Sequence, residues 1–500
     1  MWAVGWRWVP RGRCSQRLLS AVGGGIVPTP AAFANVSTPV LARSCFVLWL
    51  CSQTWLTKRA MKGLRVAESL IGPRITHAVL RRTLFKQFVA GESVDDIGGS
   101  IAQLRSVNVK CILDYAVEDD LQQAPPSDAE WDANVKSFLE CIKAANKHEC
   151  HIALKVTALG SPQLLEQTTR LLSKIWNMYH SFNESRNGHM TREEFHKGIG
   201  STGIEVDAGG LTADELFDRI DREKTGTIEV LDWILFAAPE RKPEHPIEMF
   251  IPHLEEPKRI QLQKILERLD TIATAASQAK VPVLIDAEHT FFQNAIDHVV
   301  TNLQRKYNRD GAAIISGTYQ AYRVDCARRL KVDIDRAKRE GFRFAAKLVR
   351  GAYMSEERAR AASLGYPDPI HKDRESTTGE VYKCMDLFMN NTAHADLMVA
   401  SHNAKSIEYA TQRIDDLKLP KNCVKFAQLL GMADHVTLTL SAAGYATYKY
   451  VPFGPIGKVV PYLLRRAEEN SVVTVGTTLE RRLMRQELWK RVLRVFGIRS

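Results

Sequence analysis

The sequence predicts an α/β fold of the (β/α)8 barrel class, with a helical N-terminal region and an inserted helical module of EF-hand-like pattern. Three observations predict it. Eight short β-type runs alternate with longer helical stretches, the sequence has no glycine-rich nucleotide fingerprint, and polar residues follow most of the eight runs. A chain of 500 residues is long enough for one large domain that carries such an insertion.

The first 67 residues form a basic segment without acidic residues, since the first carboxylate is Glu68. Arg-rich segments without acids are typical of mitochondrial transit peptides, so residues 1–67 are assigned to a transit and N-terminal segment. A solvated basic tail is the alternative. Because much of the net charge of +11 lies here, we expect no nucleic-acid partner. The basic residues are Arg7, Arg11, Arg13, Arg17, Arg43, Lys58, Arg59, Lys62 and Arg65.

An apolar run, CFVLWLCSQTWL, covers residues 45–56 of that segment. It is shorter than the about 20 residues that a bilayer-spanning helix needs. Arg43, Lys58 and Arg59 flank it, which fits peripheral attachment to the anionic inner mitochondrial membrane. A helix packed on the barrel is the alternative. The nine cysteines are scattered without CxxC spacing, which indicates a reducing compartment without structural zinc.

The strand predictions follow from short runs of β-branched, aromatic and other apolar residues between helical stretches. Residues 68–160 are assigned to N-terminal helices and the first barrel strands, and residues 246–500 to the remainder of the barrel with a C-terminal substrate-binding helix. The predicted strands are residues 110–115, 151–157, 281–288, 312–319, 344–349, 396–402, 424–428 and 446–451.

Polar residues gather at the carboxyl ends of these strands. In a parallel barrel those ends meet at one mouth, where the βα loops form the catalytic face. Taken singly, His402 also fits a strand-end histidine and Lys155 a lysine at the edge of the core. The polar residues at the strand ends are Asp114, Lys155, Asp286, Glu288, Gln320, Arg350, Tyr353, His402, Asn403, Gln428 and Tyr450.

Residues 161–245 are too long for one βα connection and are predicted to be an insertion. Two segments, 183–194 and 221–232, have the spacing of EF-hand loops between helical patterns. The first offers one carboxylate, Glu194, while the second offers four acidic side chains. Calcium is therefore a possible cofactor of the second loop, and a degenerate structural insertion is the alternative. The candidate calcium ligands are Asp221, Glu223, Thr225, Glu229 and Asp232.

From about residue 85 to 493 the chain resembles the proline dehydrogenase family, in its animal mitochondrial form. The resemblance implies a (β/α)8 barrel with FAD over its C-terminal face. It also implies oxidation of L-proline to 1-pyrroline-5-carboxylate, with electrons passed to a quinone on the matrix side of the inner membrane. The motifs that carry it, in order, are FVAGE, ILDYAVEDD, LKVTALG, DAEHTFFQ, TYQAY, KLVRGAY, ASHN, QLLGMADH, YKYVPFGP and YLLRRAEEN.

For the substrate, the resemblance implies that Arg465 and Arg466 hold the proline carboxylate, a task that suits paired guanidinium groups. Lys155 would add a third positive charge, and Asp286 would belong to the polar side of the pocket. The residues implied to form the apolar wall of the pocket are Tyr353, Leu429 and Tyr450.

The FAD contacts implied by the resemblance come from the ends of three predicted strands and from Thr377. Bacterial relatives resemble RLVKGAY where this chain has KLVRGAY, so a lysine and an arginine exchange places. Gly317 stands where those relatives carry a glutamine that contacts the flavin. The implied cofactor residues are Gln320, Lys347, Arg350, Gly351, Ala352, Thr377 and His402.

Tyr450 bears on the choice of substrate. The related hydroxyproline dehydrogenases resemble this chain but tend to carry a smaller hydroxylated residue at this position. Because a bulky Tyr450 would collide with a ring hydroxyl, proline is the preferred substrate and hydroxyproline the alternative. An alternative of another class is a calcium-responsive mitochondrial binding module that acts through the insertion.

Overall fold

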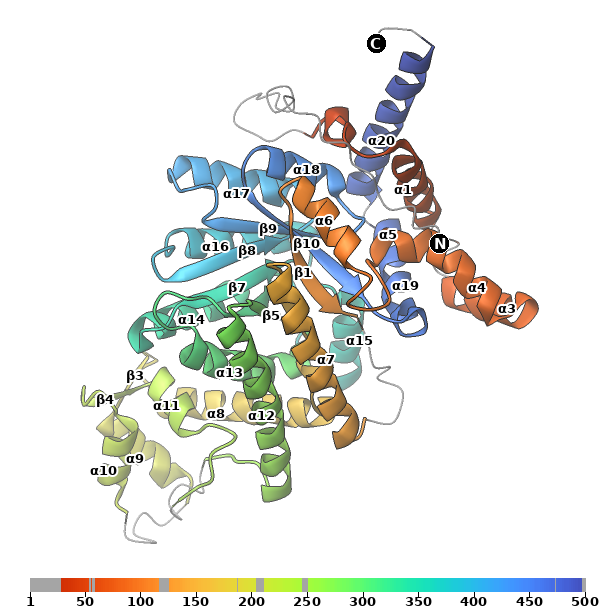
Figure 1. Ribbon diagram of the computed structural model, residues 1–500. Coiled ribbons are helices and arrows are strands. Elements are labelled where there is room, and N and C mark those ends of the chain that lie inside the picture. Colours follow the sequence, from red (N-terminus) through yellow and green to blue (C-terminus); the bar gives the residue numbers. More distant parts are fainter. Residues whose placement is uncertain are drawn as a thin grey trace.

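Eight parallel strands close into a barrel in the order β1-β10-β9-β8-β7-β6-β5-β2, and helices surround it (Figure 1). The structure is a computed structural model that describes residues 28–53, 55, 59–116, 126–186, 188–203, 211–244, 251–472 and 474–496. The predicted barrel class is confirmed.

All eight predicted strands are present, with ends that shift by a few residues. β2 is shorter than predicted, because Lys155 already precedes a short 3-10 helix, η3 (Val156–Ala158). The barrel strands are β1 (Lys110–Tyr115), β2 (His151–Leu154), β5 (Val283–Ile285), β6 (Ile315–Gln320), β7 (Phe344–Val349), β8 (Ala395–Ala400), β9 (Val424–Leu429) and β10 (Ala446–Phe453).

The interior of the barrel is filled in layers, because successive side chains of a strand point to opposite faces. One apolar layer consists of Ile112, Ala153, Leu284, Met398, Ala427 and Tyr448. Two residues further along the same strands, the next inward positions lie nearer the mouth. They are occupied by Asp114, Lys155, Asp286, Ala400, Leu429 and Tyr450. Alternation alone therefore brings candidate site residues from five strands to one end of the barrel.

Local signals in the sequence start several of the surrounding helices. In α7 (Asp128–Lys147), Ser127 and Glu130 form a capping box. In α16 (Arg374–Met389), Asp373 accepts a hydrogen bond from the backbone N–H of Ser376. The other helices around the barrel are α6 (Gly98–Ser106), α12 (Glu256–Ala279), α13 (Thr290–Tyr307), α14 (Cys326–Glu340), α15 (Met354–Leu364), α17 (Ala404–Asp416), α18 (Asp434–Ala442) and α19 (Ile456–Val472).

The insertion contains two helix–loop–helix units, and it projects from one side of the barrel (Figure 1). Two short strands, β3 (His189–Thr191) and β4 (Thr227–Glu229), join the units and pair Met190 with Ile228. The buried residues of the units are continuous with the main core of the barrel. The helices are α8 (Pro162–Phe182), α9 (Arg192–Ser201), α10 (Ala213–Ile220) and α11 (Val230–Phe236).

The two ends of the described chain pack together. α1 (Thr38–Cys51) lies beside α20 (Thr474–Val495), and Arg491 donates hydrogen bonds to the carbonyl oxygens of Phe33 and Val36 (Figure 1). The remaining helices are η1 (Pro30–Phe33), α3 (Ala60–Ile71), α4 (Pro73–Leu80), η2 (Arg81–Phe85) and α5 (Lys86–Phe88).

The N-terminal predictions need correction. The proposed boundary at residue 67 falls inside α3, and much of the apolar run 45–56 belongs to α1, where Val47, Leu48 and Cys51 are buried. This part of the run therefore packs on the protein, because these side chains fill the contact with α20. Residues 1–27 lie outside the described residues. No helix within the described ranges is long and apolar enough to cross a membrane.

Candidate active site

Three polar side chains from three strands meet at the barrel mouth. The carboxylate of Asp286, which follows β5, forms an ion pair with Lys347 of β7 and accepts a hydrogen bond from the Tyr450 hydroxyl of β10 at 2.8 Å. Lys347 is 6% exposed and its ammonium group lies 5.4 Å from the centre of the Tyr450 ring. Asp286 thus fixes both neighbours, and it turns the Tyr450 hydroxyl toward itself.

Electrostatics keep the Tyr450 hydroxyl protonated. Burial raises its pKa well above the ordinary value, and the negative charges of Asp114 and Asp286 raise it further. A neutral phenol donates a hydrogen bond to Asp286 and presents an uncharged ring to the mouth. The ring of Tyr450 is therefore suited to contact an apolar ligand at the mouth.

A second group of polar residues joins β2, β5 and β6. Glu288 accepts hydrogen bonds from the backbone and hydroxyl of Thr157, at 3.2 and 2.7 Å. Burial raises the pKa of Glu288, and this effect outweighs the hydrogen bonds from Thr157 and the nearby positive charge of Lys155, which lower it. Gln320 is buried and donates to the Glu288 carbonyl oxygen at 2.7 Å. This hydrogen bond orients the side-chain amide of Gln320 at the end of β6.

The turn after β7 makes a shallow cradle. Gly351 has φ +127°, and a Cβ atom there would lie 2.3 Å from the Tyr322 ring. Only glycine fits both the backbone conformation and the space. The preceding Arg350 donates to the carbonyl oxygen of Arg374 and to the Thr378 hydroxyl, while its buried Nη1 has no hydrogen-bond partner among the described residues. An exposed backbone turn beside a partly unsatisfied guanidinium group is suited to hold an anionic or carbonyl-bearing ligand.

Of the other two predicted cofactor residues at this turn, Ala352 follows the cradle directly and Thr377 lies in α16. Thr377 is buried, and its hydroxyl donates to the carbonyl oxygen of Asp373 in the preceding turn. Its hydroxyl hydrogen is therefore used within the helix. Gly317 faces outward, because a Cβ atom there would lie 3.0 Å from Val300 of α13.

His402 joins β8 to β9. Its Nε2 accepts the backbone N–H of Leu429 at 3.0 Å. Burial lowers the pKa of His402 to about 3, with the positive charges of Lys449 and Arg466 contributing, so the ring is neutral at physiological pH. Since Nε2 is the acceptor, the neutral ring carries its proton on Nδ1 and can donate from there.

Tyr353 directly precedes α15 and packs against His289. Its ring lies 4.2 Å, centre to centre, from the ring of His289. His289 is in turn 3.5 Å from the fully buried Glu357, which also accepts the backbone N–H of Thr290 at 2.6 Å. This stack fixes the orientation of Tyr353. Sequence analysis missed the supporting residues Tyr322 and His289, although both lie inside quoted motifs, TYQAY and DAEHTFFQ.

The paired arginines lie on α19, which follows β10. The guanidinium group of Arg466 lies 5.0 Å from the centre of the Tyr462 ring and binds Glu469 at 2.6 Å, and its side chain is 12% exposed. Its positive charge contributes to lowering the pKa of His402, after burial and Lys449. Arg465 is likewise partly buried. Both arginines are therefore partly buried on the helix that directly follows β10, and their contact with a substrate stays a prediction.

The candidate calcium ligands are bound differently from the prediction. Asp221 accepts the backbone N–H groups of Thr225 and Gly226, at 3.0 and 2.7 Å. The carboxylates of Glu223, Glu229 and Asp232 all bind the guanidinium group of Arg339 in α14, at 2.6, 2.9 and 2.9 Å.

No cluster of three or more His, Cys, Asp or Glu side chains suited to a metal ion occurs in the described part of the chain. The predicted calcium site is thus not supported, because an arginine of the barrel takes the carboxylates. Burial lowers the pKa of Arg339, but Glu223 and Asp232 outweigh burial and raise its pKa above the ordinary value. In the first loop, Glu194 accepts the backbone N–H groups of Ser185 and Thr191.

Comparison with known proteins identifies the family. Residues 98–477 match the proline dehydrogenase family, which is well over half of the chain. The chain belongs to the proline dehydrogenase family. Among curated relatives, proline dehydrogenase 1, mitochondrial, from Homo sapiens is 32% identical, over 92% of this chain and 88% of the relative. Hydroxyproline dehydrogenase from Homo sapiens is 31% identical, over 92% of each chain. Overall identity therefore does not separate the two substrates.

Solved structures agree on the fold of this proline dehydrogenase family member. Proline utilization A (PutA) from Bdellovibrio bacteriovorus, inactivated by N-propargylglycine, superposes with a TM-score of 0.58 at 16% identity. The likeness covers 87% of this chain but only 37% of that chain. At this identity the superposition supports the barrel architecture alone.

Proposed function

We propose that this protein oxidises L-proline to 1-pyrroline-5-carboxylate with FAD as its cofactor. The observation that carries the proposal is the inward-facing group of Asp286, Lys347 and Tyr450 at the barrel mouth, beside Leu429 and the α19 arginines. Family membership and the close similarity to mitochondrial proline dehydrogenase 1 support it.

The residues around the β7 turn fit FAD. Because residue 351 is a glycine, a ligand can approach the backbone closely there. The buried Nη1 of Arg350 has no hydrogen-bond partner among the described residues and could donate to the same ligand. Because Asp286 binds Lys347, we assign the cofactor-facing positive charge to Arg350 rather than to Lys347. Gln320 and His402 would supply further contacts from neighbouring strands. When bound, FAD would supply the capacity to accept a hydride.

The chain's own contribution is placement and electrostatics. Arg465 and Arg466 would bind the proline carboxylate through charged hydrogen bonds, with Lys155 adding positive charge from across the mouth. Leu429, Tyr353 and Tyr450 would enclose the pyrrolidine ring and exclude water. A ring carbon next to nitrogen then loses a hydride while the neutral amine nitrogen donates its lone pair, and the nitrogen proton leaves to solvent.

Hydroxyproline is the second candidate substrate, favoured by the similarity to hydroxyproline dehydrogenase. Tyr450 argues for proline, because its ring, held by the hydrogen bond to Asp286, would leave little space for a ring hydroxyl in the proposed pocket. Anaerobic addition of each amino acid to the purified protein tests both. We expect proline to bleach a flavin absorbance and trans-4-hydroxyproline to do so at least tenfold less efficiently. A protein without flavin, or a flavin that proline does not reduce, would refute the proposal.

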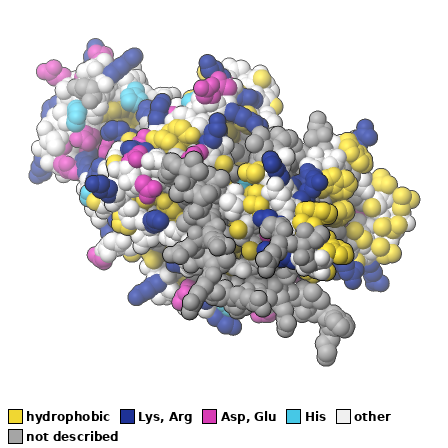
Figure 2. All heavy atoms as spheres, turned by 90° about the horizontal axis from the view of Figure 1, so that it is seen from above, with side chains coloured by type: hydrophobic (Ala, Val, Ile, Leu, Met, Phe, Trp, Pro, Cys, Tyr) yellow, Lys and Arg dark blue, Asp and Glu magenta, His cyan; other side chains and the backbone are white. Residues whose placement is uncertain are grey.

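We also propose that the protein is mitochondrial, is attached to the matrix side of the inner membrane and passes electrons to a quinone. The names of its relatives support the compartment. Attachment is supported by exposed apolar side chains on α3 and α4. Figure 2 shows hydrophobic side chains gathered, with Lys and Arg beside them, at the end of the molecule where these helices project in Figure 1. These exposed residues are Val66, Leu70, Ile71, Ile75 and Val79.

Charge on α3 and α4 complements an anionic bilayer. Residues 59–82 contain six Lys and Arg residues and one acid, Glu68. Pairs at i and i+4, Leu70 with Val66 and Val79 with Ile75, place apolar groups on one face of each helix. Binding to cardiolipin-containing vesicles should fall at least tenfold in the double variant Leu70→Glu, Ile75→Glu. Ile260→Glu on α12, which replaces an isoleucine that is 51% exposed, against 58% for Ile75, is the matched control.

A further inference from the structure

The loop between β9 and α18 is held by side chains from distant parts of the chain. Lys449 of β10 donates hydrogen bonds to the carbonyl oxygens of Leu429 and Met432, at 3.0 and 2.6 Å. Gln87 of α5 donates to the carbonyl oxygen of Gly431 at 2.9 Å. At the start of the loop, the N–H of Leu429 is bound by His402. The backbone that positions Leu429 therefore depends on residues outside its own strand.

Glu480 of α20 completes this arrangement. Its carboxylate accepts the backbone N–H groups of Ala433 and Asp434, at 3.0 and 2.6 Å, and it is 3% exposed. The residue preceding α18 is Ala433, which has no side-chain oxygen to cap the helix. Glu480 thus supplies from another helix the hydrogen bonds and the negative charge that favour a helix N-terminus.

The loop conformation needs such restraint, because two of its residues have positive φ. Ala433 has φ +52°, which costs a non-glycine residue on the order of 1–2 kcal/mol. Gly431 has φ +74°, and a Cβ atom there would lie 2.1 Å from the carbonyl oxygen of Gln87. Backbone and side chain of Gln87 both define the position of Gly431.

Buried charges surround Glu480. Lys449 is 1% exposed and forms an ion pair with Asp434 at 2.7 Å, and His435 Nδ1 lies 3.6 Å from Glu480. Burial raises the pKa of Glu480, but His435, Lys449 and the Asp434 N–H outweigh burial and hold its pKa below the ordinary value. A charged Glu480 is therefore the form that the folded protein stabilises.

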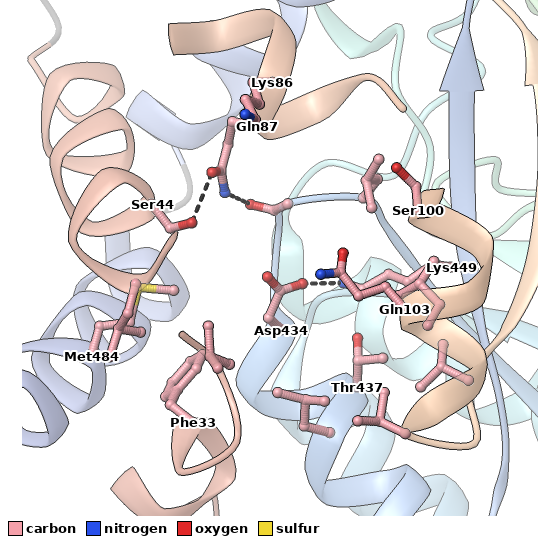
Figure 3. A pocket seen from close by; sticks show the side chains of 18 of the residues that line it. Phe33, Ser44, Lys86, Gln87, Ser100, Gln103, Asp434, Thr437, Lys449 and Met484 are labelled. Atoms are coloured by element: carbon pink, nitrogen blue, oxygen red, sulfur yellow. Dashed lines mark hydrogen bonds and ion pairs between the residues drawn. The ribbon is translucent and has the colours of Figure 1, made fainter. Parts of the chain in front are cut away.

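Figure 3 shows Gln87 between Ser44 and the loop, with Asp434 and Lys449 paired opposite. Ser44 of α1 donates to Gln87 at 2.9 Å. These residues line a cavity of about 70 Å³. That volume is far below the roughly 300 Å³ of an ordinary small-molecule site, so we assign no ligand to the cavity.

The position of these residues in the sequence is informative. Ser44, Gln87 and Glu480 all lie outside residues 98–477, the segment that matches the family. They come from the N-terminal and C-terminal helices, which pack against each other beside the barrel. Helices outside the matched segment thus hold a loop that begins at the candidate active site.

We propose that Glu480, supported by Gln87, is a positioning residue that fixes the loop 430–434 and, through it, Leu429 and His402 at the substrate mouth. This inference rests on the proposed function for the role of Leu429. The restraint of the loop by α20 is a structural claim and does not rest on the proposed function.

Glu480→Gln tests the proposal, with Glu487→Gln as matched control. Both glutamates are buried on α20, at 3% exposure each, but Glu487 pairs with Arg491 at 2.9 Å on the side of α1. In the holoenzyme, we expect Glu480→Gln to raise the KM for proline about tenfold, with kcat changed less than threefold. Glu480→Asp should recover part of the loss, and Glu487→Gln should leave the KM unchanged.

Hydrogen–deuterium exchange separates this inference from the proposed function. Amides of residues 429–435 should exchange at least tenfold faster in Glu480→Gln than in Glu487→Gln, whatever the substrate. Equal exchange in the two variants would overturn the inference even if proline is the substrate. Should Glu480→Gln fail to fold, Gln87→Met removes the bond to Gly431 and should accelerate exchange in the same peptide; unchanged exchange would again overturn it.

Discussion

The barrel mouth and the second loop of the insertion contain the same kinds of charged residue but use them differently. At the mouth, Lys347 and Asp286 form an ion pair, while Arg350 follows β7 and Arg465 and Arg466 lie on α19. In the insertion, the carboxylates of three residues bind one internal guanidinium group.

The difference teaches that a charged motif does not reveal its own partner. The acidic loop has the spacing of a cation site, yet Arg339 occupies the carboxylates from the barrel side. Its side chain is 19% exposed, and its five N–H donors can serve several oxygens at once. The insertion is thus attached to the barrel by the same kind of charge that, under the proposed function, the mouth would use to bind a small anion.

The largest expected effect comes from removing a cation of the mouth. Arg466→Gln should lower kcat/KM for proline about 100-fold, about 2.7 kcal/mol, because a carboxylate in a partly buried site loses a charged hydrogen bond. Steady-state kinetics with an artificial electron acceptor measure it. The control is Arg482→Gln, an exposed arginine of α20. Equal kinetics in the two variants would remove Arg466 from the site.

Removing the cation of the insertion should affect stability instead. Arg339→Gln leaves the carboxylate of Asp232, 5% exposed, without its ion pair, and should lower the free energy of unfolding by about 2 kcal/mol. Glu223 adds little, since it is 52% exposed. Chemical denaturation measures the loss, with the exposed Lys331→Gln of the same helix as control.

Two further outcomes sharpen this prediction. Because the variant frees three carboxylates, millimolar calcium should raise its thermal midpoint but not that of the wild-type protein. Turnover of proline should stay within twofold of wild type. A loss of turnover as large as that of Arg466→Gln would show that the two regions are not independent.

Much of the fold and part of the site could be predicted from the sequence, because their signals are local. The ends of β1 and β7 agree with prediction, since apolar strand patterns and flanking helices define them. Alternation along the strands then places Lys155, Asp286 and Tyr450 on the inward face. Arg339 could not be predicted, because it is 107 residues from Asp232 and carries no local sign of its partner. The same holds for Glu480, which caps a helix that begins 46 residues earlier.

A smaller effect should come from reshaping the mouth without changing its charge. Tyr450→Ser makes room for a ring hydroxyl and should raise the ratio of kcat/KM for hydroxyproline to that for proline about tenfold. Tyr450→Phe removes only the hydroxyl that Asp286 binds and keeps the ring, so it should leave the ratio near its wild-type value. An identical ratio in Tyr450→Ser and wild type would show that the ring of Tyr450 does not select the substrate.

The smallest expected effect concerns acid sensitivity, to which His402 at the mouth should contribute beside the buried His151 at the start of β2, whose pKa burial also lowers to about 3. His402 has a pKa of about 3 in the folded protein, against about 6.5 unfolded, so the unfolded chain binds its proton more tightly between these values. Stability therefore falls as pH drops from 6.5 toward 3, and the loss between pH 7 and 6 should be about 0.7 kcal/mol. Denaturation of His402→Gln should lack this part of the slope, whereas the exposed His196→Gln in the insertion should retain it. If both variants kept the wild-type slope, His402 would not be a source of this acid sensitivity.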